Sequence, residues 1–157
     1  MKRIISIATL ITLATLAVSA ASPADARLAQ AVKSGDKAAA AALLQQKVDV
    51  NAPETDGTTA LHWAVRADDL ALVDKLIAMG ANVKVANRYG VTPMYLASLN
   101  GSAPMLERLL KAGADANAVG TEGETALMTA ARTGNVDAAK VLLAHGAAVD
   151  SKEGWHG

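Results

Sequence analysis

Apolar side chains recur three and four positions apart in three segments of the chain, a spacing that places them on one face of an α-helix. Each segment is followed by a glycine, at Gly80, Gly113 or Gly146, which can take the left-handed conformation that closes a helix. Lys47 stands at the corresponding place earlier in the chain, where a left-handed backbone costs up to about 1 kcal/mol. The apolar positions are Val73, Leu76 and Ile77; Met105, Leu106, Leu109 and Leu110; and Ala139, Leu142 and Leu143.

A shorter helix is predicted before each of these segments. It begins at Thr59, Thr92 or Thr125, whose hydroxyl groups can accept hydrogen bonds from the free backbone N–H groups of a helix start. Pro93 follows at the first helical position, where its missing N–H group does no harm. The expected ends of these helices are Ala67-Asp68, Asn100-Gly101 and Thr133-Gly134.

The helix pairs repeat with a constant period of 33 residues. A fixed period of this length is typical of proteins in which each unit packs only on its neighbours. We expect one domain over residues 27–157, with units of about 27–54, 55–87, 88–120 and 121–153 followed by the start of a further unit. The columns in register include Gly57, Gly90 and Gly123; Ala64, Ala97 and Ala130; and Leu76, Leu109 and Leu142.

The first 26 residues differ from the rest of the chain. Lys2 and Arg3 give a positive start, an uncharged run over residues 4–21 follows, and Ala24-Asp25-Ala26 forms an A-x-A cleavage site. This order is typical of a secretory signal, so we expect residues 1–26 to be a signal peptide, with cleavage after Ala20 as a second candidate. An uncleaved membrane anchor is the alternative, since about 18 apolar residues can just span a bilayer.

Composition narrows the chemistry that the chain can perform. Cysteine is absent, which excludes disulfides, thiolate metal sites and cysteine nucleophiles. The formal net charge is zero, so composition gives no reason to expect nucleic acid or an anionic membrane as a partner. The three histidines, His62, His145 and His156, lack the spacing of a zinc site. We therefore expect no enzymatic activity, no metal and no cofactor.

Three stretches of the chain resemble the G-x-T-P-L-H-x-A motif of the ankyrin-repeat family. Residues 57–64 read GTTALHWA, residues 90–97 read GVTPMYLA and residues 123–130 read GETALMTA. Residues 109–117 read LLKAGADAN, which resembles the family's L-L-x-x-G-A-D-x-N ending. The resemblance covers roughly residues 28–157. The chain departs from the motif in keeping its histidine only at His62 and its proline only once.

The resemblance implies an all-α solenoid of stacked helix-turn-helix units with β-hairpin-like turns, preceded by a signal-peptide helix. Members of the family bind other proteins through the curved face made by the hairpin tips and first helices, called the concave face below. His62 would be the motif histidine that orders a turn, and Trp63 and Tyr95 would face the core. The implied partner-binding residues are Lys33, Thr55, Asp56, Thr58, Arg66, Arg88, Tyr89, Val91, Leu99, Asn100, Glu122, Glu124, Arg132 and Thr133.

Lys33, Arg66 and Arg132 occupy equivalent places in their units, and we call them the basic stripe. One hypothesis is that they receive an acidic or mixed-charge segment of a partner, with Tyr89 as an aromatic anchor. The other is that they pair with neighbouring hairpin acids and keep the surface soluble, since exposed pairs are worth only ~0–1 kcal/mol.

Residues 147–157 look like the hairpin of a further unit without its helices. The chain is then either a fragment of a longer array, or its open end docks on another subunit, which predicts possible self-association. The leading hypothesis is a periplasmic or secreted bacterial interaction module that binds a protein. The alternative is a regulatory or targeting segment of a larger exported enzyme or toxin.

Overall fold

The computed structural model describes residues 25–150, with the side chain of Glu122 left out. Most of the expected signal peptide, the end of the expected further unit and His156 lie outside the described residues. Within residues 25–150, no helix has the length and apolar character needed to cross a membrane.

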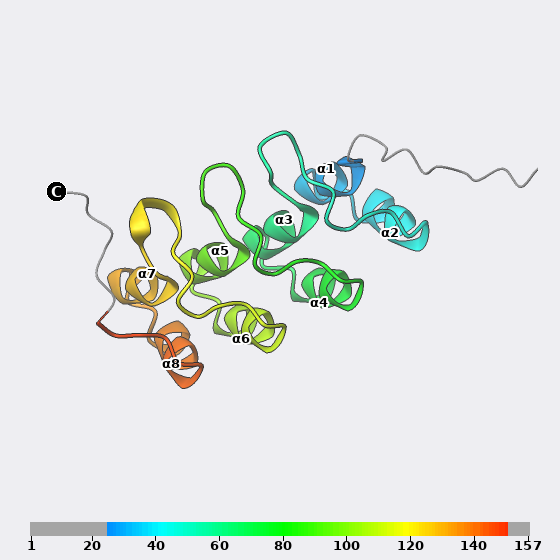
Figure 1. Ribbon diagram of the computed structural model, residues 1–157. Coiled ribbons are helices and arrows are strands. Elements are labelled where there is room, and N and C mark those ends of the chain that lie inside the picture. Colours follow the sequence, from blue (N-terminus) through cyan, green and yellow to red (C-terminus); the bar gives the residue numbers. More distant parts are fainter. Residues whose placement is uncertain (1–24, 151–157) are drawn as a thin grey trace, which may run out of the picture.

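The described part of the chain forms eight α-helices and one 3-10 turn, arranged as four antiparallel helix pairs (Figure 1). The first helices of the pairs are α1 (Arg27–Lys33), α3 (Ala60–Arg66), α5 (Pro93–Asn100) and α7 (Ala126–Thr133). The second helices are α2 (Lys37–Gln45), α4 (Leu70–Ala78), α6 (Ala103–Lys111) and α8 (Val136–Ala144). The 3-10 turn η1 (Thr121–Gly123) precedes α7.

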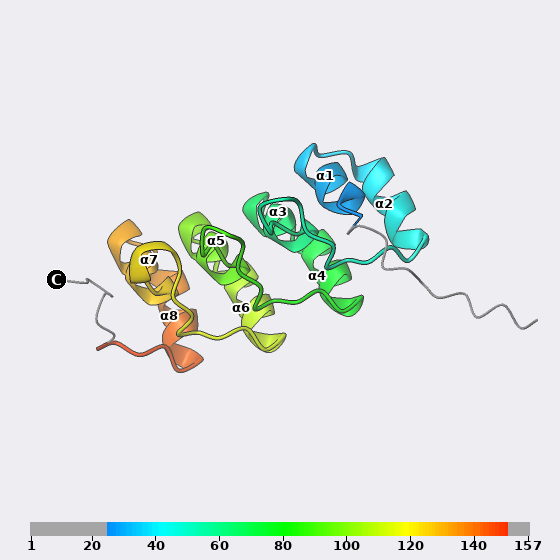
Figure 2. The same cartoon turned by 45° about the horizontal axis from the view of Figure 1, so that its top comes forward.

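The helices lie in two rows, and the same order is seen from a second direction in Figure 2. In the first row α1 packs on α3, α3 on α5 and α5 on α7, and in the second row α4 packs on α6 and α6 on α8. The loops that precede α3, α5 and α7 project beyond the first row (Figure 1). This arrangement confirms the predicted all-α solenoid.

The core runs along the solenoid between the two rows. Ala64, Ala97 and Ala130 are 0% exposed and lie in the first-row helices, where a small side chain lets neighbouring helices approach closely. Leu76 and Leu109 of the second row are also fully buried. The alanine and leucine columns with a period of 33 are therefore positions that bury apolar surface between neighbouring units.

The helix ends follow the predicted backbone chemistry. Gly80, Gly113 and Gly146 have φ of 88°, 92° and 85° after the second helices, and Lys47 takes the same left-handed conformation with φ of 54°. Asp68 also has a positive φ, 53°, and acidic residues tolerate this conformation better than most. The predicted cap at Thr92 is present, because its side chain accepts a hydrogen bond from a backbone N–H of α5 at 3.1 Å.

The loops before α3, α5 and α7 share one backbone hydrogen bond across their base. Glu54 N–H donates to Thr58 at 2.8 Å, Asn87 donates to Val91 at 3.0 Å, and the third loop repeats the bond from Gly120 at 2.8 Å. One antiparallel bridge, between residues 119 and 125, adds to the third loop. These bonds account for the predicted β-hairpin-like turns.

Candidate functional site

The concave face contains a pocket of about 340 Å³ between α3, α5 and two hairpin loops. Six of the predicted partner-binding residues line it, and five further residues complete it. The predicted residues are Asp56, Thr58, Arg66, Tyr89, Val91 and Leu99, and the others are His62, Trp63, Asn87, Tyr95 and Leu96. The structure thus brings together six of the nine predicted residues from the second and third units, and Thr55, Arg88 and Asn100 do not line the pocket.

Two apolar side chains at the rim of this pocket are exposed to solvent. Tyr89 is 67% exposed at the tip of its loop, and Leu99 is 41% exposed at the end of α5. Exposed apolar side chains gathered around a hollow are a feature of binding surfaces. The aromatic anchor predicted at Tyr89 is therefore accessible.

Trp63 and Tyr95, which the resemblance places towards the core, are only partly buried and also line the pocket. Trp63 packs against the core cluster as expected, and the pocket gives it a second role. The reason lies in its column: Leu96 and Thr129 stand at equivalent positions, so this helix position lies between the buried side and the concave face.

The indole of Trp63 is held by charged neighbours. Its N–H donates to the carboxylate of Glu54 at 2.7 Å, and the ammonium of Lys33 lies 4.8 Å from the ring centre. The guanidinium of Arg66 lies 5.9 Å from the same ring. Such cation–π contacts fix a ring at an exposed site by about 0.5–1 kcal/mol.

The three members of the basic stripe have different surroundings. Lys33 forms an ion pair with Glu54 at 3.2 Å, and Arg132 forms one with Glu124 at 2.8 Å. Within the described residues, Arg66 forms no ion pair with a carboxylate, and its side chain is exposed. Pairing with hairpin acids thus accounts for two of the three cations and leaves Arg66.

The carboxylate of Glu124 is held by two neighbouring side chains. Arg132 lowers the pKa of Glu124 through a hydrogen bond, and the hydroxyl of Thr129 adds a second one at 3.1 Å. The carboxylate stays ionised in neutral solution and remains bound to its neighbours. Glu122, the other predicted acid of this hairpin, belongs to η1, and its side chain is outside the described set.

Several of the predicted partner-binding residues hold neighbouring units together. Arg88 donates from its guanidinium to the carbonyl of Thr55 at 2.7 Å. Thr58 is only 6% exposed, and its hydroxyl accepts a hydrogen bond from the Asn87 amide at 3.1 Å. These contacts tie the hairpin before α3 to the hairpin before α5 and give the concave face a fixed shape.

The ends of the first helices contribute in the same way. The side-chain amide of Asn100 donates to the carbonyl of Val65 at 2.9 Å, which joins α5 to α3. The hydroxyl of Thr133 donates to the carbonyl of Thr129 at 2.8 Å, within α7. Both groups therefore have partners inside the protein.

His62 is buried and joins two units, as expected of the motif histidine. Its Nδ1 accepts from the backbone N–H of Thr59 at 3.2 Å, which assigns the proton to Nε2. The Nε2–H then donates to the carbonyl of Val91 in the next hairpin at 3.0 Å. Burial lowers the pKa of His62, because removal from water disfavours the charged imidazolium.

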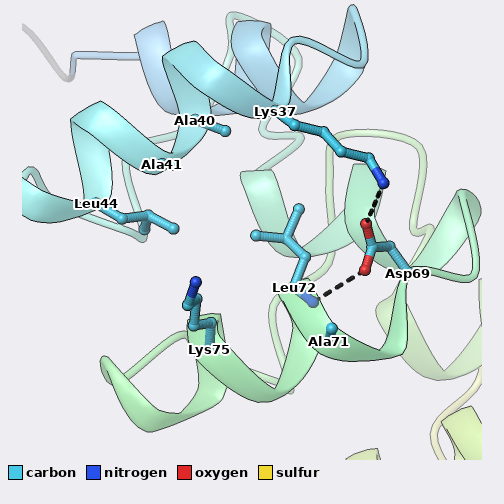
Figure 3. Close-up of a pocket in the computed structure, with 8 residues that line it drawn as sticks. All are labelled: Lys37, Ala40, Ala41, Leu44, Asp69, Ala71, Leu72 and Lys75. Carbon is cyan, nitrogen blue, oxygen red and sulfur yellow. Dashed lines mark hydrogen bonds and ion pairs between the residues drawn. The ribbon is translucent and has the colours of Figure 1, made fainter.

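A second hollow, of about 240 Å³, lies on the opposite side of the solenoid between α2 and α4 (Figure 3). At its wall Ala40 stands where the second and third units have the larger Val73 and Leu106. Lys37 and Asp69 form an ion pair of 3.7 Å at its edge. No predicted partner-binding residue lines this hollow. The run of alanines at residues 38–42 was the sequence signal for it.

Among residues 25–150, no three of the His, Asp and Glu side chains come close enough together to hold a metal ion. In the same part of the chain, every buried side-chain nitrogen or oxygen has a hydrogen-bond partner. The interior of this part of the chain is therefore packed without an unpaired buried polar side chain.

Comparison with known families agrees with the geometry. A family model described as ankyrin repeats in three copies matches residues 28–119 and again residues 97–156. The chain belongs to the ankyrin-repeat family. Ankyrin repeats are generally protein–protein interaction modules, and in this ankyrin-repeat protein the concave face carries the pocket just described. No curated protein matches the sequence significantly.

Proposed function

We propose that this ankyrin-repeat protein is a non-catalytic scaffold that binds another protein through its concave face. The observation that carries the proposal is the pocket of about 340 Å³, with Tyr89 and Leu99 exposed at its rim. Binding surfaces take most of their affinity from a few aromatic, aliphatic and arginine side chains around such a hollow.

The rigidity of this face supports the proposal. The bonds of Arg88 to Thr55 and of Asn100 to Val65 fix the two hairpins and the two helices that border the pocket. A surface that is already ordered loses little conformational entropy on binding. The fixed shape therefore lowers the entropic cost of binding a partner.

The state of the acidic groups favours a scaffold over an enzyme. The pKa of Asp56 is lowered by the backbone N–H of Thr58, and the pKa of Glu124 is lowered by Arg132. A general acid or base near neutral pH needs a carboxyl with a raised pKa. These two carboxylates are instead held in hydrogen bonds within the protein.

The proposal extends to an exported location, periplasmic or secreted. It is supported by Lys2 and Arg3, the uncharged run over residues 4–21 and the A-x-A site that ends at Ala26. Amino-terminal sequencing of the protein from its native cell tests this location. A first residue at Arg27 in the exported fraction supports it, and an intact Met1 in the cytoplasmic fraction contradicts it.

Self-association through the last unit is a further proposal. Val136 and Leu143 of α8 are 63% and 47% exposed, so apolar surface is open on this helix. Sedimentation of the protein and of the Leu143→Ser variant tests it. A dimer that the substitution dissociates supports the proposal, and a monomer at all concentrations overturns it.

Site-specific photo-crosslinking tests the binding face. A photoreactive amino acid at position 89 or 99 should give the same protein adduct in the native cell. The matched control at Lys75, which lines the hollow between α2 and α4 (Figure 3), should give none. Adducts from position 75 alone would place the binding surface on the outer helices. Under the alternative hypothesis of a larger exported enzyme or toxin, the adduct is another part of that same polypeptide.

A further inference from the structure

We propose that the pocket beside Arg66 receives a partner segment in which a carboxylate-bearing side chain stands next to a large apolar side chain. The inference rests on the proposed function, because it names the chemistry of the partner at the same concave face. It assigns Arg66 the role of carboxylate receptor and leaves the other two cations of the basic stripe without that role.

The reason that Arg66 is available lies in two hairpin positions. Lys33 takes its carboxylate from Glu54, and the residue 33 positions later, next to Arg66, is the neutral Asn87. Arg132 takes its carboxylate from Glu124, and the equivalent residue in the unit of Arg66 is Thr58. The two hairpin positions that supply carboxylates to Lys33 and Arg132 are therefore neutral around Arg66. Its guanidinium can donate hydrogen bonds to a carboxylate from a partner.

Asp56 lines the same pocket, but its carboxylate is engaged within its own loop. The backbone N–H of Thr58 donates to it at 2.9 Å, and this bond is the main cause of the lowered pKa of Asp56. The Arg66 guanidinium, in contrast, has no carboxylate partner among the described residues. The cation open to a partner carboxylate is therefore Arg66.

The apolar half of the site lies against Arg66. Leu99 stands at the basic-stripe position in the third unit, and it lines the pocket with Tyr89, Tyr95 and Leu96. Two aromatic and two leucine side chains around one hollow favour a large apolar side chain. Together the two halves recognise an acidic residue beside a leucine or aromatic residue.

A protein segment fits this site better than a nucleic acid. Binding to a phosphate backbone needs several cations that all contact phosphates. On this face Lys33 and Arg132 are neutralised by Glu54 and Glu124. Of the basic stripe, Arg66 alone has no carboxylate partner among the described residues, and with its apolar neighbours it is suited to one carboxylate and one apolar group.

Selection from a displayed library of random dodecapeptides tests the inference with the purified protein. The selected peptides should be enriched in Asp or Glu next to Leu, Phe or Trp. Arg66→Gln should weaken their binding roughly tenfold, while the matched control Arg132→Gln leaves it unchanged. Arg66→Glu should bind a peptide in which the acidic residue is replaced by Lys. Circular dichroism melting of each variant shows whether the fold is intact.

The outcomes separate the inference from the proposed function. Selected peptides without acidic residues, bound in a way that Tyr89→Ala weakens and Arg66→Gln does not, overturn the inference and leave the concave face as the binding surface. Peptides indifferent to Tyr89→Ala, or a library that yields no binder, overturn both.

Discussion

The indole N–H of Trp63 donates a hydrogen bond to the carboxylate of Glu54 at 2.7 Å. The same carboxylate accepts from Lys33 at 3.2 Å, so one acidic side chain joins the end of α1 to the middle of α3. Glu54 is the first residue of the hairpin bond to Thr58. This three-residue contact fixes the first two units relative to each other on the concave face.

Replacement of Glu54 by Ala should weaken the joint between the first two units. The indole N–H and the Lys33 ammonium both lose their partner, and we expect the free energy of unfolding to fall by about 1–2 kcal/mol. Urea denaturation followed by circular dichroism measures the loss. Asp137→Ala is the matched control, because its ion pair with Lys140 is highly exposed and should contribute nothing measurable. Equal effects of the two substitutions would show that Glu54 has no structural role.

Gly120→Ala should destabilise the protein through a steric contact. A Cβ atom at position 120 would lie 2.7 Å from Cδ2 and 2.9 Å from Cγ of Tyr95. The backbone of Gly120 is extended, with φ of −93°, so the cost comes from overpacking, which is about 1–3 kcal/mol. Thermal melting should show the loss, and Tyr95→Ala in the same chain should remove most of it. A lack of coupling in this double-mutant cycle would contradict the close contact.

Lys84→Asn should stabilise the protein. Asn51 donates to the carbonyl of Gly80 at 2.9 Å and accepts from the backbone N–H of Asn82 at 2.7 Å. Asn117 makes the corresponding bonds to Gly146 and Ala148 at 3.2 and 2.8 Å. Lys84 stands at this position in the unit between them.

With asparagine at position 84, the same two bonds can form to the next loop, and we expect a gain of about 1–2 kcal/mol. The measurement is the free energy of unfolding, with Lys84→Ala as the control for removal of the lysine. A variant with asparagine that is no more stable than the one with alanine would show that the bridge does not form at this position.

His62 should make stability depend on pH just below neutrality. Burial lowers its pKa in the folded protein from 6.5, so the unfolded chain binds the proton more readily than the folded one. Stability from this group is therefore complete above pH 6.5, and it falls as the pH drops towards the folded pKa. Below the pKa of His62 in the folded protein, the contribution of this group to stability no longer changes with pH.

The His62→Gln variant should lose this dependence, because a glutamine at the same position can still cap the helix start but does not titrate. Denaturation at pH 7 and pH 5 for both proteins is the measurement. The carboxylates Asp56 and Glu124, whose pKa values are lowered from 3.8 and 4.5, titrate outside this range. An identical pH slope in the two proteins would contradict the buried neutral imidazole.

The fold was predictable because the left-handed backbone positions recur at the same place in each unit. Lys47 is in register with Gly80, and it adopts the left-handed conformation, with φ of 54°. The threonine caps and the buried alanines follow from the same columns. Where a column is mixed, as at Trp63, the prediction was incomplete. The ring packs against the core and also lines the pocket, and Leu96 and Thr129 at the equivalent positions do not indicate this second role.

The site was predictable only as a set of positions. Lys33 finds its carboxylate 21 residues later, whereas Arg132 finds it eight residues earlier. Which carboxylate each cation reaches depends on the orientation of the hairpin relative to its helix. Residue spacing does not determine that orientation. The availability of Arg66 and the hollow beside Ala40 therefore required the three-dimensional structure.

Hydrogen–deuterium exchange of the protein, alone and bound to the partner recovered by crosslinking, tests the central claim most directly. The account predicts slower exchange in the hairpins 54–58 and 87–91 and at the end of α3, with α2 and α4 unchanged on their outer side. Protection confined to α2 and α4, around the hollow of Figure 3, would contradict binding through the concave face.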